Sequence, residues 1–369
     1  MNNKVVIIGS GMASYMLAIE LRAQSKEVDI TIVTEGDGRY YPKPMLSSAL
    51  YHKKSPAMIT TASAQEMGEK YQLEILTHTR CVGINQDKSA VIAESGKEIL
   101  YDNLVLATGS IPRPLPLPDG GGEQAYQVNT IEQYERLLEA LEKKKRIAVI
   151  GSGLVGVEFA HDLITAGYQV VLFSQTEQAL DQLVPEGVGK RVANHLRQLG
   201  VDWQTEPIIS LAENGTKINT KTKAFSVDAS LAAIGIQAQT ELATKIGLRV
   251  DQAIAVNQYH QTSEENIYAI GDCASIEGLH LTYVAPIKQQ VKALAQTLLG
   301  NASKVEYPPM PVVVKMPTLP LTMVPRRKVT DGKWETLESE SDSAIAVFYD
   351  SGREIQGFVL AGEATKQRN

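Results

Sequence analysis

The sequence has few of the residues that build metal centres or disulfide frameworks. Among 369 residues there are only two cysteines, Cys81 and Cys273, and they form no CxxC or CxxxxC pair. The six histidines are scattered and lack the spacing of a metal-ligand pair. These absences argue against a disulfide scaffold, a metal site and a dithiol active site. Demanding chemistry must therefore come from a bound cofactor.

Long apolar runs and a strong net charge are also lacking. No stretch approaches the about 18 apolar residues that span a bilayer, and the N-terminus has no signal-peptide pattern. Thirty-six basic and 42 acidic residues give a net charge of −6, which does not favour nucleic acid or an anionic membrane as a partner. We therefore expect a cytoplasmic protein with two or three hydrophobic cores.

Near the N-terminus an apolar run breaks into glycines. Residues 5–8 predict a buried parallel strand, and Gly9-Ser10-Gly11 follows directly. Gly9 suits a tight turn, and Gly11 lets the backbone approach a pyrophosphate. The helix predicted over 12–22 would direct its N-terminal N–H groups at that anion. Ser14 stands in place of the third glycine of a GxGxxG motif, and a plain glycine turn is the alternative to a dinucleotide site.

An acidic residue follows at the distance expected for a ribose ligand. Glu35 comes 24 residues after Gly11 and follows the apolar run 30–33. A carboxylate there accepts hydrogen bonds from the ribose hydroxyls of an adenosine. Asp37 is a rival for the same role.

The order of strand, glycines and helix recurs 142 residues later. Residues 146–150 predict another buried strand, and the glycine motif after it is complete, with Gly151, Gly153 and Gly156. Because the recurrence has the spacing of a domain, one chain is predicted to hold two dinucleotides.

The second unit differs from most NAD domains at its ribose end. Its second strand, 170–173, ends at Ser174-Gln175, where an acid is usual, and the nearest acid is Glu177. No Arg or Lys stands at 174–175 to bind a 2′-phosphate, so the sequence favours NADH over NADPH.

Three further stretches place polar groups near the predicted sites. Lys43 lies between two prolines that restrict its backbone. A short strand over 266–270 delivers Asp272 at its C-terminal end, where ligands of open α/β sheets bind. A long helix opens at Pro286 with its positive end free for an anionic group. An ordinary surface lysine and a turn-capping aspartate are the alternatives for Lys43 and Asp272.

With these motifs in order, the chain resembles the flavoprotein reductases with two dinucleotide domains, which include disulfide, ferredoxin and rubredoxin reductases. The stretch Lys43-Pro44-Met45-Leu46-Ser47 resembles the KPxLS loop of the ferredoxin and rubredoxin reductases. The tail 307–317, with Gly332-Lys333-Trp334 and Gly357-Phe358, most resembles the rubredoxin–NAD reductases. No cysteine stands at 40–48, which disfavours disulfide reduction and a cysteine-based oxidase or peroxidase.

The resemblance implies an α/β fold with two Rossmann-like dinucleotide-binding domains and a small α+β C-terminal domain. Residues 1–112 and 236–306 would form a discontinuous FAD-binding domain. Residues 113–235 would form the NAD(H)-binding domain, and residues 307–369 the C-terminal domain.

The resemblance also implies roles for residues. Glu35 would bind the adenosine ribose of FAD, Asp272 would bind the ribitol chain, and the helix opening at Pro286 would face the N1–C2=O edge of the flavin. Lys43 would lie beside flavin N5 and pair with Glu158, and these two are the expected catalytic residues. The expected FAD-binding residues are Gly9, Gly11, Met12, Ala13, Ser14, Glu35, Lys43, Pro44, Cys81, Val82, Ala107, Thr108, Gly109, Arg113, Gly271, Asp272 and Lys288. The expected NAD-binding residues are Gly151, Gly153, Leu154, Val155, Gly156, Glu158, Gln175 and Gly235.

The implied activity is hydride transfer from NADH to FAD, followed by single-electron transfer to the iron of rubredoxin or a rubredoxin-like protein. The alternatives are a ferredoxin reductase of an oxygenase system and a slow, NADH-binding flavoprotein sensor. A monomer or homodimer is expected. Because rubredoxins are generally acidic, basic residues are candidates for docking, with dispersed solubilising charge as the alternative. The candidates are Arg39, Lys53, Lys54 and Arg326-Arg327-Lys328.

Overall fold

The protein divides into two compact units, each assembled from separate parts of the chain. The computed structural model describes residues 3–118, 120–142, 145–326, 331–340 and 343–367. The first unit comprises Met1–Lys43, Met58–Ile111 and Ile236–Met310. The second unit comprises Pro44–Ala57, Pro112–Gly235 and Pro311–Asn369.

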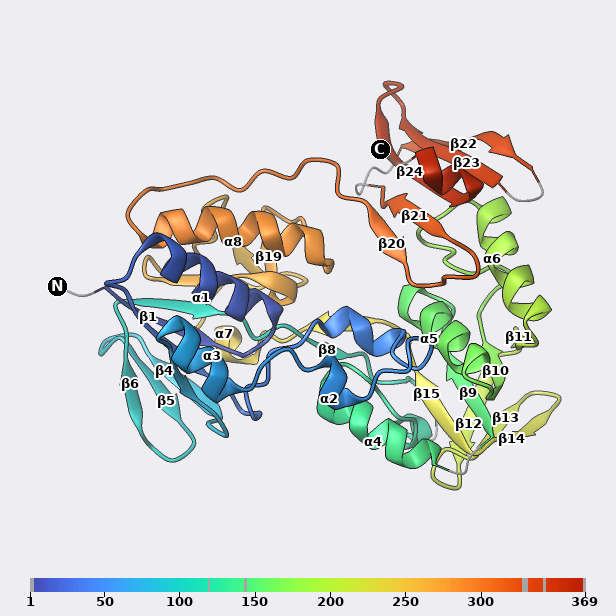
Figure 1. Cartoon of the computed structure of the whole chain (residues 1–369), viewed down its shortest axis with the longest axis horizontal. Helices are drawn as coiled ribbons and strands as arrows, with labels where there is room; N and C mark the ends of the chain where they lie inside the picture. Colours follow the sequence, from blue (N-terminus) through green and yellow to red (C-terminus); the bar gives the residue numbers. More distant parts are fainter. Residues whose placement is uncertain (1–2, 119, 143–144, 327–330, 341–342, 368–369) are drawn as a thin grey trace. The chain divides into compact units, whose positions relative to one another are not determined.

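The first unit is built on a five-stranded parallel sheet in the order β18-β7-β1-β2-β3. Val5, Val6 and Ile7 have no exposed surface, because the sheet is covered on both faces as its β-branched strands require. Helices α1 and α8 pack against each other beside it (Figure 1). The elements are β1 (Lys4–Ile8), α1 (Met12–Gln24), β2 (Asp29–Val33), β3 (Glu74–Leu76), β7 (Asn103–Leu106), β18 (Ile267–Ala269) and α8 (Val284–Leu298).

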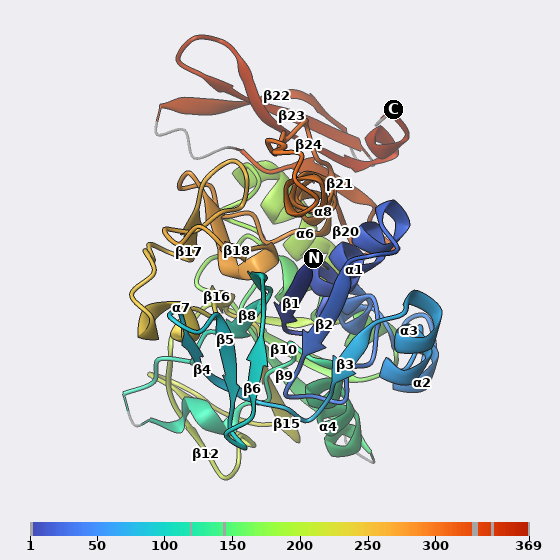
Figure 2. The same ribbon diagram turned by 90° about the vertical axis from the view of Figure 1, so that its left-hand side faces the viewer.

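Smaller elements complete the first unit. An antiparallel sheet of three strands lies together in Figure 2 and consists of β4 (Cys81–Asn85), β5 (Ala90–Ala93) and β6 (Glu98–Leu100). Strand β4 was not predicted from the sequence. The other elements are α3 (Ala64–Tyr71), β8 (Ser110–Pro112), β16 (Ile236–Ala238), α7 (Glu241–Lys245), β17 (Ile254–Val256) and β19 (Ala274–Ile276).

The second unit contains another parallel sheet, in the order β11-β10-β9-β15. Helix α4 begins where Thr130 and Gln133 form a reciprocal capping box, as the sequence signature favours. The elements are α2 (Pro56–Ile59), α4 (Ile131–Leu141), β9 (Arg146–Ile150), α5 (Leu154–Thr165), β10 (Gln169–Phe173), α6 (Glu186–Gln198), β11 (Asp202–Gln204), β12 (Ile208–Ala212), β13 (Lys217–Thr220), β14 (Ala224–Ser226) and β15 (Ala229–Ala232).

The C-terminal segment is an antiparallel sheet of five strands in the order β20-β21-β24-β23-β22, followed by a 3-10 turn at Glu363–Gln367. Met323, Ala346 and Val359 have no exposed surface and form its core. The strands are β20 (Val312–Val314), β21 (Leu321–Val324), β22 (Gly332–Ser339), β23 (Ser343–Asp350) and β24 (Ile355–Gly362). The apolar runs 312–314, 344–349 and 356–360 predict β20, β23 and β24 from the sequence, whereas no such run predicts β21 or the largely exposed β22.

The predicted fold class is confirmed, since each glycine motif joins a buried strand of a parallel sheet to a helix. The long helix expected to open at Pro286 begins two residues earlier, at Val284, so that Pro286 lies in its first turn. Among the described residues, no helix has both the length and the apolar character needed to cross a membrane.

Candidate functional site

The two glycine turns have nearly the same geometry. Gly9 and Gly151 both have a φ of 110°, a conformation that L side chains rarely adopt. A Cβ on Gly9 would lie 2.3 Å from the carbonyl oxygen of Ala107, and a Cβ on Gly151 would lie 2.5 Å from that of Ala233. Glycine is therefore required at both turns, because a neighbouring backbone occupies the space of a side chain.

The helix that follows each turn begins with N–H groups that no side chain of the described residues caps. Gly11 and Gly153 are the N-caps of α1 and α5, and neither cap is made by a side chain. Apart from the glycine itself and the adjoining backbone, no heavy atom of the described residues lies within 4 Å of the position of a Cβ at either glycine. Open space beside the first N–H groups of a helix suits an anion such as a pyrophosphate. Both sites therefore fit the dinucleotides predicted from the sequence.

The third position of the motif differs between the two units. A Cβ on Gly156 would lie 2.0 Å from the carbonyl oxygen of Gly151, so helix and turn are in close contact. The first unit tolerates Ser14 at this position. Its side chain has no exposed surface, and its Oγ has no hydrogen-bond partner among the described residues. An orphaned hydroxyl behind the first glycine turn is compatible with a bound group that completes it.

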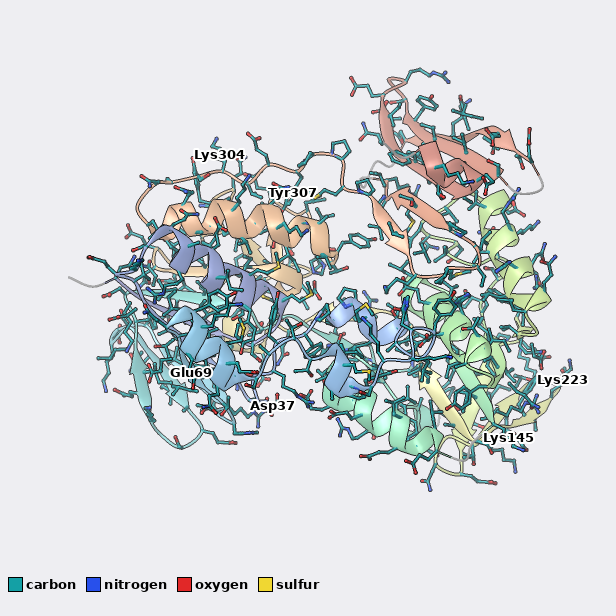
Figure 3. The ribbon with its side chains drawn as sticks, viewed as in Figure 1. Asp37, Glu69, Lys145, Lys223, Lys304 and Tyr307 are labelled. Atoms are coloured by element: carbon teal, nitrogen blue, oxygen red, sulfur yellow. The ribbon has the colours of Figure 1, made fainter. Side chains whose placement is uncertain are left out.

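A polar cluster lies at the carboxyl end of the first sheet. The Oδ2 atom of Asp272 accepts a hydrogen bond from Ser110 Oγ over 3.0 Å and lies 3.7 Å from Lys43 Nζ. Gln290 on α8 fixes the preceding turn by accepting the N–H of Gly271 over 2.9 Å. It also donates over 3.0 Å to the hydroxyl of Tyr307, which Figure 3 labels beside α8. The cluster brings together residues from five separate stretches of the chain.

Burial lowers the pKa of Lys43 from its ordinary value, and the Asp272 carboxylate opposes part of this decrease. The expected pairing of Lys43 with Glu158 would join residues of different units and stays a prediction. Lys43 pairs with Asp272 in the first unit, whereas Glu158 pairs with Lys315 in the second. Lys315, 157 residues after Glu158 in the sequence, supplies the cation within the second unit.

Glu158 is the centre of a buried network on α5. Only 1% of it is exposed, so its charge requires close partners. Its Oε2 atom lies 2.6 Å from Ser47 Oγ and 2.6 Å from Lys315 Nζ, and its Oε1 atom accepts the backbone N–H of Lys315 over 2.9 Å.

Asp162 lies one turn further along α5 and holds backbone donors. Its Oδ1 and Oδ2 atoms accept the N–H groups of Tyr51 over 2.7 Å and of Leu50 over 3.2 Å. Burial raises the pKa of Asp162 to about 6. Together, Asp162 and Glu158 explain why Pro44–Ala57 belongs to the second unit, although the sequence analysis assigned it to the FAD domain.

Two histidines of the second unit contact the hydroxyl group of Thr318. The Nε2 atoms of His161 on α5 and His195 on α6 each lie 2.7 Å from Thr318 Oγ1. Burial lowers the pKa of His161 to about 4, and the nearby His195 contributes to the decrease. The pKa of His195 is lowered by burial as well.

The candidate ribose ligands that follow β2 and β10 differ in whether they are exposed or already held in an ion pair. Glu35 is exposed directly beyond β2, whereas Asp37, labelled in Figure 3, forms an ion pair of 2.6 Å with Arg39. In the second unit Gln175 is exposed beyond β10, and Glu177 pairs with Arg197. Asp37 is therefore the weaker candidate for a ribose ligand, because its carboxylate is already engaged.

The other predicted residues are distributed over both units. Cys81 and Val82 begin β4, burial raises the pKa of Cys81 to about 11, and Lys288 is exposed on α8. Ala107, Thr108 and Gly109 follow β7 in the first unit, while Met12 and Ala13 begin α1 and Leu154 and Val155 begin α5. Pro44 and Arg113 belong to the second unit, where the N–H of Arg113 donates over 3.0 Å to the carbonyl of Gly235.

Ser110, Asp162, Lys315 and Thr318 are among the residues of these networks that the sequence analysis did not single out. Only Asp162 carries a local signal, because it lies four residues after Glu158 on the same face of a helix. The other three come from distant segments that only folding brings to their partners.

Comparisons with known proteins agree with this geometry. Residues 3–296 match the model of the pyridine nucleotide-disulphide oxidoreductases, and residues 304–369 match the rubredoxin binding C-terminal domain. The chain belongs to the pyridine nucleotide-disulphide oxidoreductase family. This membership confirms the predicted family and enzyme class, an oxidoreductase, and the cofactors FAD and NADH.

Individual members of the family match the whole chain. A rubredoxin-NAD(+) reductase of Acinetobacter baylyi is 37% identical, covering 99% of this chain and 95% of its own length. A nitric oxide reductase FlRd-NAD(+) reductase of Aliivibrio fischeri is 31% identical, covering 99% and 97%. Among solved structures, the covalent putidaredoxin reductase–putidaredoxin complex has a TM-score of 0.89 at 26% identity, covering 99% of this chain and 91% of that one.

Proposed function

We propose that this chain is an NADH:rubredoxin oxidoreductase. The observation that carries the proposal is the presence of two dinucleotide turns of matching geometry in one chain, followed by a segment that matches the rubredoxin binding domain. Two such turns suit a bound flavin and a nicotinamide cofactor. The C-terminal match supports rubredoxin, or a rubredoxin-like iron protein, as the electron acceptor.

We assign FAD to the first unit. Gly9, Gly11 and the N-terminus of α1 would hold its pyrophosphate, and the exposed Glu35 would accept its ribose hydroxyls. When bound, FAD takes up a hydride from NADH and releases the electrons one at a time to an iron protein.

The Lys43–Asp272 pair is assigned to the flavin end of this site. Asp272 holds the lysine ammonium, and Ser110 orients the carboxylate through its hydroxyl. A lysine held in this way stabilises negative charge that develops nearby, because its position is set before the reaction begins. The N-terminus of α8 adds a partial positive charge at the same end of the sheet.

NADH is assigned to the second unit. Gly151, Gly153 and the N-terminus of α5 would hold its pyrophosphate, and Glu158 on the same helix would face the nicotinamide end. Each dinucleotide would therefore have its own glycine turn and its own carboxylate, the partly buried Asp272 in the first unit or the buried Glu158 in the second. A cytoplasmic location and a monomeric or homodimeric state stay predictions from the sequence.

An anaerobic experiment tests the proposal. The FAD-loaded protein is mixed with NADH or NADPH and then with oxidised rubredoxin, while both chromophores are followed. Fast flavin bleaching by NADH, followed by rubredoxin reduction, is expected. Rubredoxin that stays oxidised in the presence of reduced flavin would refute the acceptor assignment.

A ferredoxin reductase is the second candidate, because the likeness to the putidaredoxin reductase complex extends over nearly the whole chain. A ferredoxin serves as the parallel acceptor in the same experiment. Faster reduction of ferredoxin than of rubredoxin would favour this candidate. Slow transfer to both acceptors would favour a sensor.

A further inference from the structure

Lys315 joins the C-terminal segment to the helix of the second glycine motif. It directly follows β20 and contacts Glu158 twice, through Nζ at 2.6 Å and through its backbone N–H at 2.9 Å. The Lys315 side chain is 27% exposed, whereas that of Glu158 is 1% exposed. The cation therefore reaches inward from a partly open position to a carboxylate that is closed off from water.

All the hydrogen bonds that the structure assigns to the Glu158 carboxylate come from outside the continuous stretch 112–235. Ser47 donates from the segment 44–57, and Lys315 donates from the C-terminal segment. A buried carboxylate keeps one orientation only while its partners are in place, and the loss of one partner leaves an uncompensated charge. The orientation of Glu158 is thus determined by two other parts of the chain.

A second contact fixes the same loop of the C-terminal segment. Thr318, three residues after Lys315, contacts His161 and His195 over 2.7 Å each. His161 lies three residues after Glu158 on α5 and is also 1% exposed. Two attachment points on one helix restrict rotation of the loop, so Lys315 is held in register with Glu158.

We propose that Lys315 is a positioning residue for the reduction of the flavin by NADH, acting by orienting Glu158. This inference rests on the proposed function, in which Glu158 faces the nicotinamide. Its consequence is that a residue of the rubredoxin-binding segment acts before rubredoxin takes part. A lysine that served only for docking would affect the second half of the reaction alone.

The test uses the FAD-loaded full-length protein and three variants. Lys315→Met removes the charge, Lys315→Arg keeps it, and Lys333→Met is a matched control on an exposed lysine of the same segment. Flavin reduction by NADH is measured without rubredoxin, and NAD⁺ binding to the oxidised protein is measured by calorimetry. We expect Lys315→Met to slow flavin reduction about tenfold, because a misplaced group in a site is costly, and to weaken NAD⁺ binding. Lys315→Arg is expected to keep most of the wild-type rate of flavin reduction and most of the affinity for NAD⁺. Lys333→Met is expected to change neither quantity.

A double-mutant cycle separates positioning from a general loss of structure. In the Glu158→Gln background, Lys315→Met is expected to have no further effect on flavin reduction, because the group that it orients has already been altered. Additive effects of the two substitutions would contradict the proposal. If Lys315→Met does not fold, Lys315→Gln, which retains a donor, is measured in the same way.

Failure of the inference is distinguishable from failure of the proposed function. Unchanged flavin reduction in Lys315→Met, with slower rubredoxin reduction, would overturn the positioning role and leave the function intact. If the wild-type protein does not reduce rubredoxin, rubredoxin is refuted as the acceptor. The effects of the Lys315 variants on flavin reduction and on NAD⁺ binding would still decide whether Lys315 is a positioning residue.

Discussion

The backbone N–H of Tyr51 donates to Asp162 Oδ1 over 2.7 Å, and this bond ties the segment that follows Lys43 to helix α5. Burial raises the pKa of Asp162 to about 6, above the ordinary value of 3.8. Between these values the folded state binds more protons than the unfolded state, so the contribution of Asp162 to stability falls as the pH rises.

Asp162→Asn should remove this pH dependence, because the amide does not titrate. Between about pH 4 and pH 6 the shift of roughly two units corresponds to at most about 3 kcal/mol. We expect the stability of the wild type relative to the variant to decrease by part of this amount as the pH rises through that window. Chemical unfolding at several pH values measures it, and a constant difference between the two proteins would contradict the expectation.

His161 should have the opposite effect in nearly the same window. Its pKa is about 4 in the folded protein against an ordinary 6.5, so the folded state binds fewer protons and stability is lost as the pH falls from about 6.5 to about 4. His161→Gln keeps an amide that can hydrogen-bond to Thr318 and should reduce this acid sensitivity. In the wild type the pH dependences of stability that His161 and Asp162 contribute have opposite signs and partly cancel. Each single variant should therefore show the pH dependence that the remaining group contributes. If the stability of the wild type and of His161→Gln changed equally with pH, the proposed contribution of His161 would be excluded.

Lys43→Met should slow the reduction of flavin by NADH without loss of FAD. The lysine contacts Asp272 at the flavin end of the proposed site, whereas the glycine turn that would hold the pyrophosphate is left intact. Rapid mixing measures the rate, and the absorbance ratio of flavin to protein measures the FAD content. Unchanged reduction kinetics would remove Lys43 from the mechanism.

Glu177→Gln should improve the use of NADPH relative to NADH. Glu177 neutralises Arg197, which also lies over the ring of Trp203 at 5.2 Å. Loss of the carboxylate charge leaves a guanidinium that is available to a 2′-phosphate. We expect the ratio of kcat/KM for NADPH to that for NADH to rise about tenfold, about 1.4 kcal/mol of discrimination. Arg197→Leu in the same background is the control and should abolish the gain.

Lys53→Glu combined with Lys54→Glu should lower kcat/KM for rubredoxin and leave flavin reduction unchanged. Both lysines are exposed, whereas Arg39 is engaged with Asp37 and is the weaker docking candidate. Arg327 and Lys328 lie outside the described residues. An acidic partner would be attracted electrostatically, so the wild-type rate should fall with rising ionic strength. A salt-independent rate would argue against electrostatic docking.

Much of the fold was predictable, because its signals are local. A β-branched run that ends at a glycine restricts the chain to a buried strand and a tight turn within a few residues, as at Val5–Gly9 and again at Arg146–Gly151. Steric contact with Ala107 and Ala233 then requires glycine at both turns. Strands without a clear apolar pattern were missed. An example is β22, which has few apolar residues and no buried one.

The partners of the charged residues could not be derived in this way. The sequence by itself determined that Lys43, Glu158 and Asp272 carry charge near the carboxyl ends of strands or the start of a helix. Only the tertiary structure decided that Lys43 pairs with Asp272 and that Glu158 pairs with Lys315, 157 residues away. The physical reason is that a glycine turn depends on neighbours within a few residues, whereas a carboxylate pairs with whichever cation folding brings within about 4 Å of it.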